Sequence, residues 1–145
     1  MIVITGGAGF IGSAIIQELN QRGRTDLVVV DDVDHPEKEK NLASIKYKKI
    51  IRKEAFLESV LNLGLQSTET IIHMGACSST TETDESFLTK NNYEYTRHLA
   101  TYAIEKDIRF IYASSAATYG NGEMGYCDDE SKLHTLKPLN LYGHS

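Results

Sequence analysis

Tryptophan is absent from the 145-residue sequence, and cysteine and proline occur only twice each. Cys77 and Cys127 have neither the number of a disulfide framework nor the spacing of a zinc site, which favours reduced thiols and a cytoplasmic location. No excess of basic residues exists: the net charge is −5, which argues against a nucleic-acid partner or an anionic membrane. Apolar runs such as Leu27–Val30 are far too short to span a bilayer, and the N-terminal "MIVITGG" lacks the pattern of a signal peptide.

Short apolar runs alternate with longer segments in which apolar residues recur at helical spacing. Each apolar run is typical of a buried parallel strand, and the alternation indicates strand–helix–strand units. We therefore predict one α/β domain over residues 1–145, with a doubly wound parallel sheet covered by helices on both faces. The predicted strands are residues 1–5, 27–31, 47–51, 70–75 and 109–115, and the predicted helices are residues 10–22, 54–64 and 85–107.

Two segments are predicted to be irregular. Residues 32–46 are polar and contain Pro36, which we expect to break any helix, so a loop followed by a short turn is predicted there. Residues after Gly120 are polar and rich in turn formers until "KPLNLYGHS", where Pro138 is placed to open a helix. That helix would have only begun at Ser145, so we expect the domain to be incomplete, with the last helix and strand and a substrate domain lying beyond.

A glycine-rich loop, "TGGAGFIG" at residues 5–12, joins the first predicted strand to the first predicted helix. Its glycines permit a tight turn and let backbone N–H groups approach a pyrophosphate at the helix N-terminus. Asp31 ends the second predicted strand, about 20 residues beyond the loop, where dinucleotide-binding folds of the Rossmann type place a ribose-binding acid. A tight turn without a ligand is the alternative, but the strand, helix and acid together favour dinucleotide binding.

The choice between NAD and NADP stays open at the sequence level. Asp31, Asp32 and Asp34 concentrate negative charge that would repel a 2′-phosphate. Lys38 and Lys40 follow closely and would offset that repulsion if the loop folded back.

The fifth predicted strand ends in "YASSAATYG" at residues 112–120, which places Ser114 and Ser115 at the carboxyl edge of the sheet, where such folds bind ligands. With the glycine loop and Tyr142 downstream, the chain resembles the extended short-chain dehydrogenase/reductase family. That family uses a serine or threonine after the fifth strand and a Tyr-x-x-x-Lys motif on the next helix. The corresponding lysine would fall at position 146, beyond this sequence, so we expect the 145-residue chain itself to be inactive.

Three further segments, "GACSSTTE", "NNYEYT" and "KPLNLYG", resemble the NAD(P)-dependent epimerases of this family that act on an ADP-linked heptose. The resemblance implies inversion at C6 by transient oxidation and reduction, for lipopolysaccharide core biosynthesis. It further implies a nucleotide-sugar substrate, NADP as cofactor with NAD possible, and a homo-oligomeric parent protein. Alternatives are another sugar-nucleotide epimerase or oxidoreductase of the superfamily, or a catalytically silent nucleotide-binding fragment.

The same resemblance assigns individual residues. Ser115 and Tyr142 fall in the family's catalytic positions. No metal site is expected. The family commonly has asparagine where this chain has Asp32, and this difference bears on the implied preference for NADP. The implied cofactor-binding residues are Gly6, Gly7, Gly9, Phe10, Ile11, Gly12, Asp31, Asp32, Lys38, Lys53, Met74, Gly75, Ala76, Cys77, Ser78 and Asn91.

Overall fold

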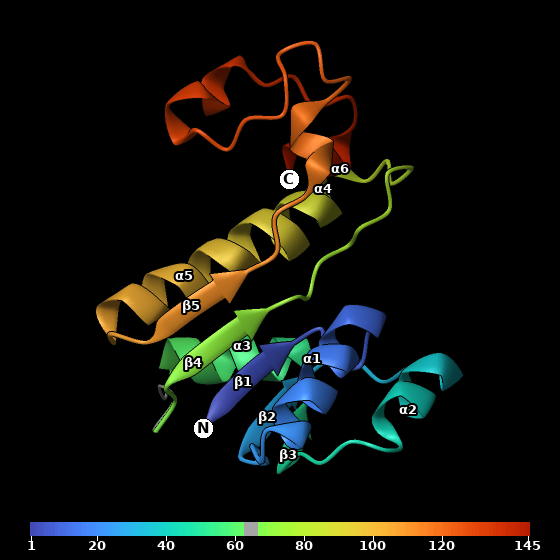
Figure 1. Ribbon diagram of the computed structural model, residues 1–145, viewed down its shortest axis with the longest axis vertical. Helices are drawn as coiled ribbons and strands as arrows, with labels where there is room; N and C mark the ends of the chain where they lie inside the picture. Colours follow the sequence, from blue (N-terminus) through green and yellow to red (C-terminus); the bar gives the residue numbers. More distant parts are fainter. Residues whose placement is uncertain (63–66) are drawn as a thin grey trace. The chain divides into compact units, whose positions relative to one another are not determined.

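The computed structural model describes residues 1–62 and 67–145, and the chain divides into two compact units (Figure 1). The first unit comprises Met1–Gly75 and Tyr95–Ala113, and the second comprises Ala76–Glu94 and Ser114–Ser145. Within the described residues, no helix combines the length and the apolar character needed to cross a membrane.

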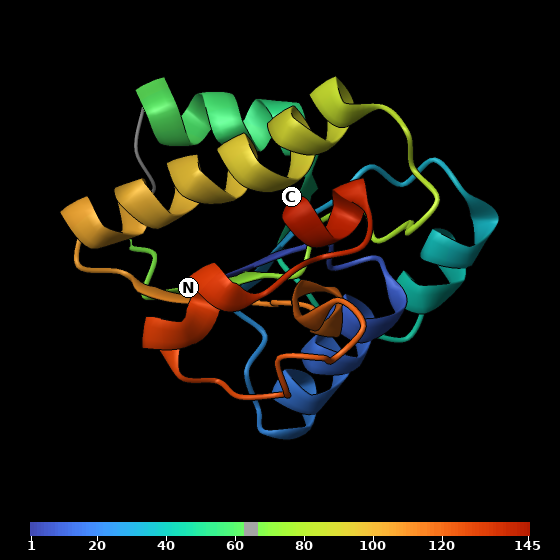
Figure 2. The ribbon, with the colours of Figure 1, turned by 90° about the horizontal axis from the view of Figure 1, so that it is seen from above.

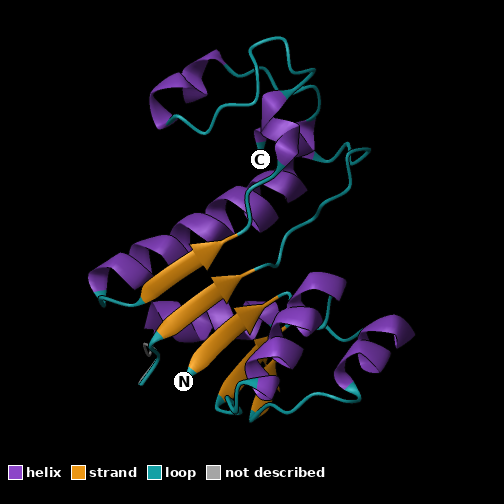
Figure 3. Ribbon diagram, viewed as in Figure 1, coloured by secondary structure: helices purple, strands orange, loops and turns teal. Residues whose placement is uncertain are grey.

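A five-stranded parallel sheet forms the centre of the first unit, as predicted (Figure 3). Isoleucine, valine and leucine make up β1 and β2 except for Thr5, and every residue of both strands is buried because both faces of these strands are covered. The strand order is β3-β2-β1-β4-β5, which brings the carboxyl ends of β1, β2 and β4 to one edge. The strands are β1 (Ile2–Thr5), β2 (Leu27–Val30), β3 (Lys49–Ile51), β4 (Thr70–His73) and β5 (Arg109–Tyr112).

Helices cover both faces of this sheet (Figure 2). On one face lie α3 (Lys53–Asn62) and α5 (Tyr95–Glu105), and on the other lie α1 (Phe10–Gln21) and α2 (Pro36–Leu42). The predicted doubly wound arrangement is therefore confirmed. The helix predicted at 54–64 begins one residue earlier, and the last two of its predicted residues lie outside the described residues.

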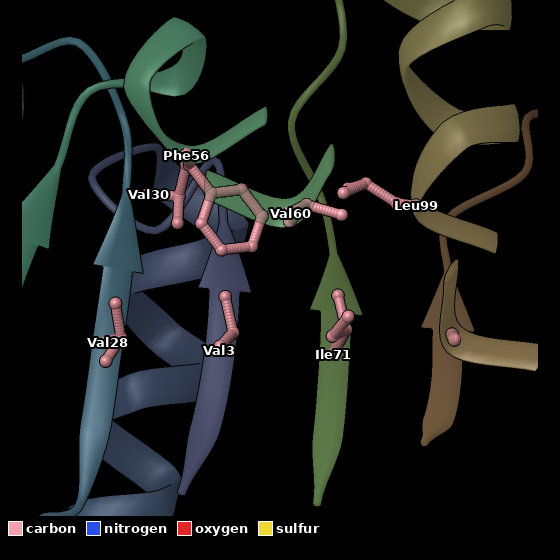
Figure 4. Close-up of a cluster of buried hydrophobic side chains, with 8 residues drawn as sticks. Val3, Val28, Val30, Phe56, Val60, Ile71 and Leu99 are labelled. Carbon is pink, nitrogen blue, oxygen red and sulfur yellow. The ribbon is translucent and has the colours of Figure 1, made fainter. Parts of the chain in front are cut away.

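Two apolar clusters, one on each face, hold the layers together. Phe56 of α3 and Leu99 of α5 pack on Val3 and Ile71 of the sheet (Figure 4), and Ile16 of α1 belongs to the opposite cluster. Phe56 is fully buried, and removing such a side chain from water stabilises the fold by about 1.5–3 kcal/mol.

The expectation that Pro36 breaks any helix was wrong. Pro36 instead begins α2, at the first helical position, where proline loses no hydrogen bond because that N–H has no partner within a helix. His35 precedes it in an extended conformation, and its Nδ1 accepts a hydrogen bond from the N–H of Glu37 at 3.3 Å. Pro36 therefore starts a helix instead of ending one, and this start places Lys38 in the first turn of α2.

The long helix predicted at 85–107 is interrupted. Glu85–Leu88 form α4, Thr89–Glu94 form the π-helical turn η1, and α5 follows from Tyr95. A π turn is a feature that apolar periodicity does not reveal, and such turns occur frequently at functional sites. Its residues belong to the second unit.

The rest of the second unit consists of short helical segments and turns. Two 3-10 segments, η2 (Ala116–Tyr119) and η3 (Glu130–Thr135), precede the short helix α6 (Leu141–His144). The helix expected to open at Pro138 starts three residues later. Asn140 sets this start, because its Oδ1 accepts a hydrogen bond from the N–H of Gly143 at 2.8 Å.

Candidate functional site

The glycine loop between β1 and α1 is packed so closely that side chains would not fit. Gly6 has a φ of +65°, and a Cβ there would lie 2.7 Å from the backbone nitrogen of Gly75. A Cβ on Gly12 would clash with the carbonyl oxygen of Gly6. The loop therefore requires glycine at both positions for backbone conformation and for close backbone approach.

The start of α1 has the character of an anion site. Gly9 is the N-cap and offers no side-chain hydrogen bond to the first helical N–H groups. Phe10 and Ile11 follow with 85% and 62% of their surface exposed, which is unusual for large apolar side chains. An uncapped helix start beside exposed apolar groups suits a phosphate-containing ligand with an apolar part.

Asp31 connects the end of β2 to this loop. Its Oδ2 accepts a hydrogen bond from the N–H of Ala8 at 2.9 Å, and its Oδ1 pairs with the Nζ of Lys38 at 3.1 Å. Only 10% of the Asp31 side chain is exposed. The carboxylate predicted to bind a ribose thus also fixes the glycine loop.

Lys38 is the central cation of this edge. Its Nζ donates to Asp31, to the carbonyl oxygen of Asp32 at 2.7 Å and to Asp34 at 3.3 Å. Burial by itself would lower the pKa of Lys38, but hydrogen bonds and charge from Asp31 and Asp34 outweigh it and raise the pKa above its ordinary value. The loop does fold back, as the sequence required for Lys38 to neutralise the acids.

Asp32 lies between two further cations. Arg52 Nε is 3.6 Å from its Oδ1 and Lys53 Nζ is 4.0 Å from its Oδ2. Asp32 Oδ1 is buried and accepts no hydrogen bond from the residues that the structure describes, which leaves an acceptor position that a ligand hydroxyl could fill. Lys53 opens α3, and its carbonyl oxygen accepts a hydrogen bond from the hydroxyl of Tyr95 at 3.0 Å.

The first residues after β4 are tied to β1 through Thr5. The N–H of Met74 donates to the carbonyl oxygen of Thr5 at 3.1 Å, and the N–H of Gly75 donates to its hydroxyl, also at 3.1 Å. That hydroxyl lies 2.5 Å from Nδ1 of the buried His73. Sequence analysis identified neither Thr5 nor His73; the signal was a polar residue at the end of each of two strands.

In the second unit, residues 76–78 continue this segment. Ala76 and Ser78 are exposed, whereas Cys77 is held through both backbone polar groups by the side chain of Asn92. The predicted cofactor residue Asn91 is half-buried and donates from Nδ2 to Asn92 Oδ1 at 2.9 Å. Asn92 itself was not predicted, although the sequence "NN" offered two candidates.

Ser115 and Tyr142, the predicted catalytic pair, both lie in the second unit. Ser115 caps η2, and its Oγ accepts a hydrogen bond from the N–H of Ala117 at 3.2 Å. Tyr142 lies in α6 and is half-buried. A Cβ on Gly143 would come within 2.9 Å of the carbonyl oxygen of Ala117, so α6 contacts the turn that carries Ser115.

Three features of this edge match the requirements of a dinucleotide site. The glycine cradle, the uncapped start of α1 and the orphaned Asp32 oxygen match a pyrophosphate and ribose hydroxyls. Among the residues that the structure describes, no group of three or more His, Cys, Asp or Glu side chains is placed to hold a metal.

Comparison with known proteins gives one consistent family. Residues 2–145 match the NAD dependent epimerase/dehydratase family. Proteins named ADP-L-glycero-D-manno-heptose-6-epimerase from Nitratidesulfovibrio vulgaris and Fusobacterium nucleatum are 48% and 49% identical to this chain over its full length. The chain spans about 45% of the length of these relatives.

Solved structures show the same likeness. The crystal structure of ADP-L-glycero-D-manno-heptose-6-epimerase from Helicobacter pylori matches 99% of this chain and 46% of its own, with a TM-score of 0.80 and 29% identity. UDP-glucuronic acid 4-epimerase from Bacillus cereus, in complex with NAD, matches 99% of this chain and 47% of its own, with a TM-score of 0.78 and 25% identity.

Proposed function

Because the chain belongs to the NAD dependent epimerase/dehydratase family, we propose that it is the cofactor-binding part of an epimerase that inverts C6 of an ADP-linked heptose. Identity of 48% over the whole chain to proteins named for that reaction is the observation that supports the substrate. Lipopolysaccharide core biosynthesis is the process in which we place the parent protein. Residues 1–145 would form its dinucleotide-binding domain, incomplete without the part that binds the sugar.

We propose NADP as the cofactor, with NAD as the alternative. Lys38 is already directed to the acids at the end of β2, and Arg52 and Lys53 lie beside Asp32, so three cations surround the expected position of the adenosine ribose. They would offset the repulsion between the carboxylates and a 2′-phosphate. NAD would need only the carboxylates, which could accept hydrogen bonds from both ribose hydroxyls.

Calorimetric titration of this chain with each dinucleotide tests the choice, with Lys38→Gln as the variant. Loss of a charge-assisted contact should weaken NADP binding by about 10-fold or more while NAD binding changes far less. Lys106→Gln, at an exposed lysine that directly follows α5, is the control and should leave both affinities unchanged. Equal weakening of both cofactors by Lys38→Gln would contradict the proposal.

We propose that Ser115 and Tyr142 are the catalytic residues. A bound nicotinamide dinucleotide would accept a hydride from the sugar carbon and return it to the opposite face. Tyr142 would take and return the hydroxyl proton, while the Ser115 hydroxyl donates a hydrogen bond to the reacting oxygen. Useful general-base action by a phenol at neutral pH needs nearby positive charge that shifts it toward its ionised form.

In the family, a lysine four residues after the tyrosine supplies positive charge for this shift. We therefore propose that the 145-residue chain has no useful epimerase activity of its own, and that Tyr142 is activated only in a protein that continues with that lysine. Incubating the chain with NADP and an ADP-linked heptose tests this, with the epimer resolved by chromatography. Turnover by the 145-residue chain would refute it.

A sugar-nucleotide oxidoreductase is the competing function. It would change the reduced-nicotinamide absorbance in step with substrate, whereas an epimerase leaves that absorbance constant at steady state. We further propose that the parent protein is a homo-oligomer in the cytoplasm.

A further inference from the structure

The side chain of Asn92 lies at a junction in the second unit. It projects from the π-helical turn η1 and is buried, with 6% of its surface exposed. Its Oδ1 accepts from the N–H of Cys77 at 2.9 Å and its Nδ2 donates to the carbonyl oxygen of Cys77 at 3.0 Å. Nδ2 also donates to the hydroxyl of Ser145 at 2.9 Å.

These contacts use the whole hydrogen-bonding capacity of the amide. Oδ1 accepts a second bond, from Asn91 Nδ2 at 2.9 Å, so two acceptor positions and two donor hydrogens are all paired. Two acceptors face Nδ2 and two donors face Oδ1, which leaves a single orientation for the amide. No isosteric side chain reproduces this pattern, because leucine has no polar group and aspartate has no hydrogen to donate.

Ser145 extends the network into the helix that carries Tyr142. The Ser145 hydroxyl accepts from Asn92 and donates to the carbonyl oxygen of Tyr142 at 2.9 Å. One continuous set of hydrogen bonds therefore runs from the backbone of Cys77 through Asn92 and Ser145 to the backbone of Tyr142.

We propose that Asn92 is a positioning residue that fixes α6, and with it Tyr142, relative to the segment at residues 76–78. The inference rests on the proposed function, in which that segment lines the cofactor and Tyr142 exchanges the substrate proton. The Asn92 amide is fully occupied by protein partners, so its role would be to hold Tyr142 at a fixed distance from the segment that lines the cofactor. Such a link matters because misplacing a reacting group by about 1 Å can cost on the order of 100-fold in rate.

Backbone amide exchange, measured by NMR on the 145-residue chain, tests this positioning role of Asn92 without requiring enzyme activity. Asn92→Asp keeps the acceptor for the Cys77 N–H but loses both donors, including the one to Ser145, so exchange should quicken at the amides of His144 and Ser145. Ser145→Ala should quicken exchange in α6 alone. Asn20→Asp is the matched control, because the Asn20 amide, in the first unit, also accepts from one backbone N–H and donates twice, there to two carbonyl oxygens. Unchanged exchange at residues 141–145 in Asn92→Asp would overturn the proposal.

Kinetics of the protein that extends beyond Ser145 test the positioning role. Ser145→Ala should lower kcat by about 10-fold, because Tyr142 loses its fixed distance to the reacting atoms, while KM for the sugar changes little. Ser59→Ala, which removes a similar hydroxyl-to-carbonyl bond in α3, should leave kcat unchanged. If the two residues act through one network, the double variant Asn92→Asp/Ser145→Ala should lose no more kcat than the more affected of the two single variants. Full kcat in Ser145→Ala, or strictly additive losses, would overturn the inference, whereas an unmodified protein without turnover would contradict the proposed function instead.

Discussion

Acidification should destabilise the first unit through His73. This imidazole is 4% exposed and lies between the rings of Tyr95 and Phe110, with centroids 5.8 and 6.1 Å away. Burial lowers its pKa to about 4 from an ordinary value of 6.5. The Thr5 hydroxyl accepts the N–H of Gly75 and lies 2.5 Å from Nδ1, while Nε2 lies 2.8 Å from the Thr96 hydroxyl. Both ring nitrogens of the neutral imidazole thus have hydroxyl partners, whereas no carboxylate among the described residues pairs with the ring to compensate the charge of its protonated form.

The sign and size of the effect follow from proton linkage. Between the folded pKa near 4 and the unfolded pKa near 6.5, the unfolded chain binds a proton that the folded chain does not. Stability is therefore complete above about pH 6.5 and falls as the pH is lowered, by up to about 1.4 kcal/mol per pH unit. The expected loss is about 2 kcal/mol between about pH 7.5 and pH 5, and about 3 kcal/mol once the pH has passed below 4.

Urea unfolding followed by far-UV circular dichroism measures this loss, because the chain has no tryptophan for fluorescence. Above about pH 5, the pH dependence of stability reports on His73 and not on the surface carboxylates. Those carboxylates bind protons in the unfolded state only nearer their ordinary pKa values. His73→Gln should be less stable at neutral pH but should lose about 2 kcal/mol of the pH dependence. An unchanged slope in His73→Gln would refute the reasoning.

Three substitutions, one of them with a matched control, test other parts of the fold and site. Gly12→Ala should abolish dinucleotide binding in calorimetry, because its Cβ would clash with the backbone of Gly6 and Gly7. The control is Gly23→Ala, at a positive φ with no described atom within 4 Å of the added Cβ. It should lower the free energy of unfolding by only about 1–2 kcal/mol and keep dinucleotide binding. Phe56→Ala should lower the free energy of unfolding by about 3–5 kcal/mol in urea, since the ring is fully buried between α3 and the sheet. Gly143→Ala should displace α6 from the carbonyl of Ala117 and lower kcat of the longer protein more than its thermal midpoint, with no change in kcat contradicting the contact.

Sequence patterns predicted the sheet because its signals are local and physical. The runs of β1 and β2 are apolar at every position but Thr5, since helices cover both faces of the sheet. The close backbone contacts of the loop after β1 require glycine, which made the loop visible in the sequence. Pro36 was misjudged because the same ring that ends a helix from within is well placed at its first position.

The links between segments could not be predicted in this way. Asn92 and Thr5 act through partners 15 and about 70 residues away, and no periodicity connects such positions. The π turn that carries Asn92 also leaves no apolar signature, because it shifts a helix by one residue without changing its composition. Long-range polar contacts of this kind are found only once the backbone has brought them together.

The central place of β1 in the sheet has a consequence for synthesis on the ribosome. β1 can pair with β2, and β2 with β3, once residue 51 has emerged, but the other edge of β1 waits for β4 at residues 70–73. At about 5–20 residues per second, the apolar edge of the first-made strand stays unpaired for about 1–4 seconds. During that interval the nascent chain offers an exposed template for strand addition from other chains. Slower translation between β3 and β4 would lengthen this exposure, so aggregation of the newly made protein should depend on the codons of that short stretch.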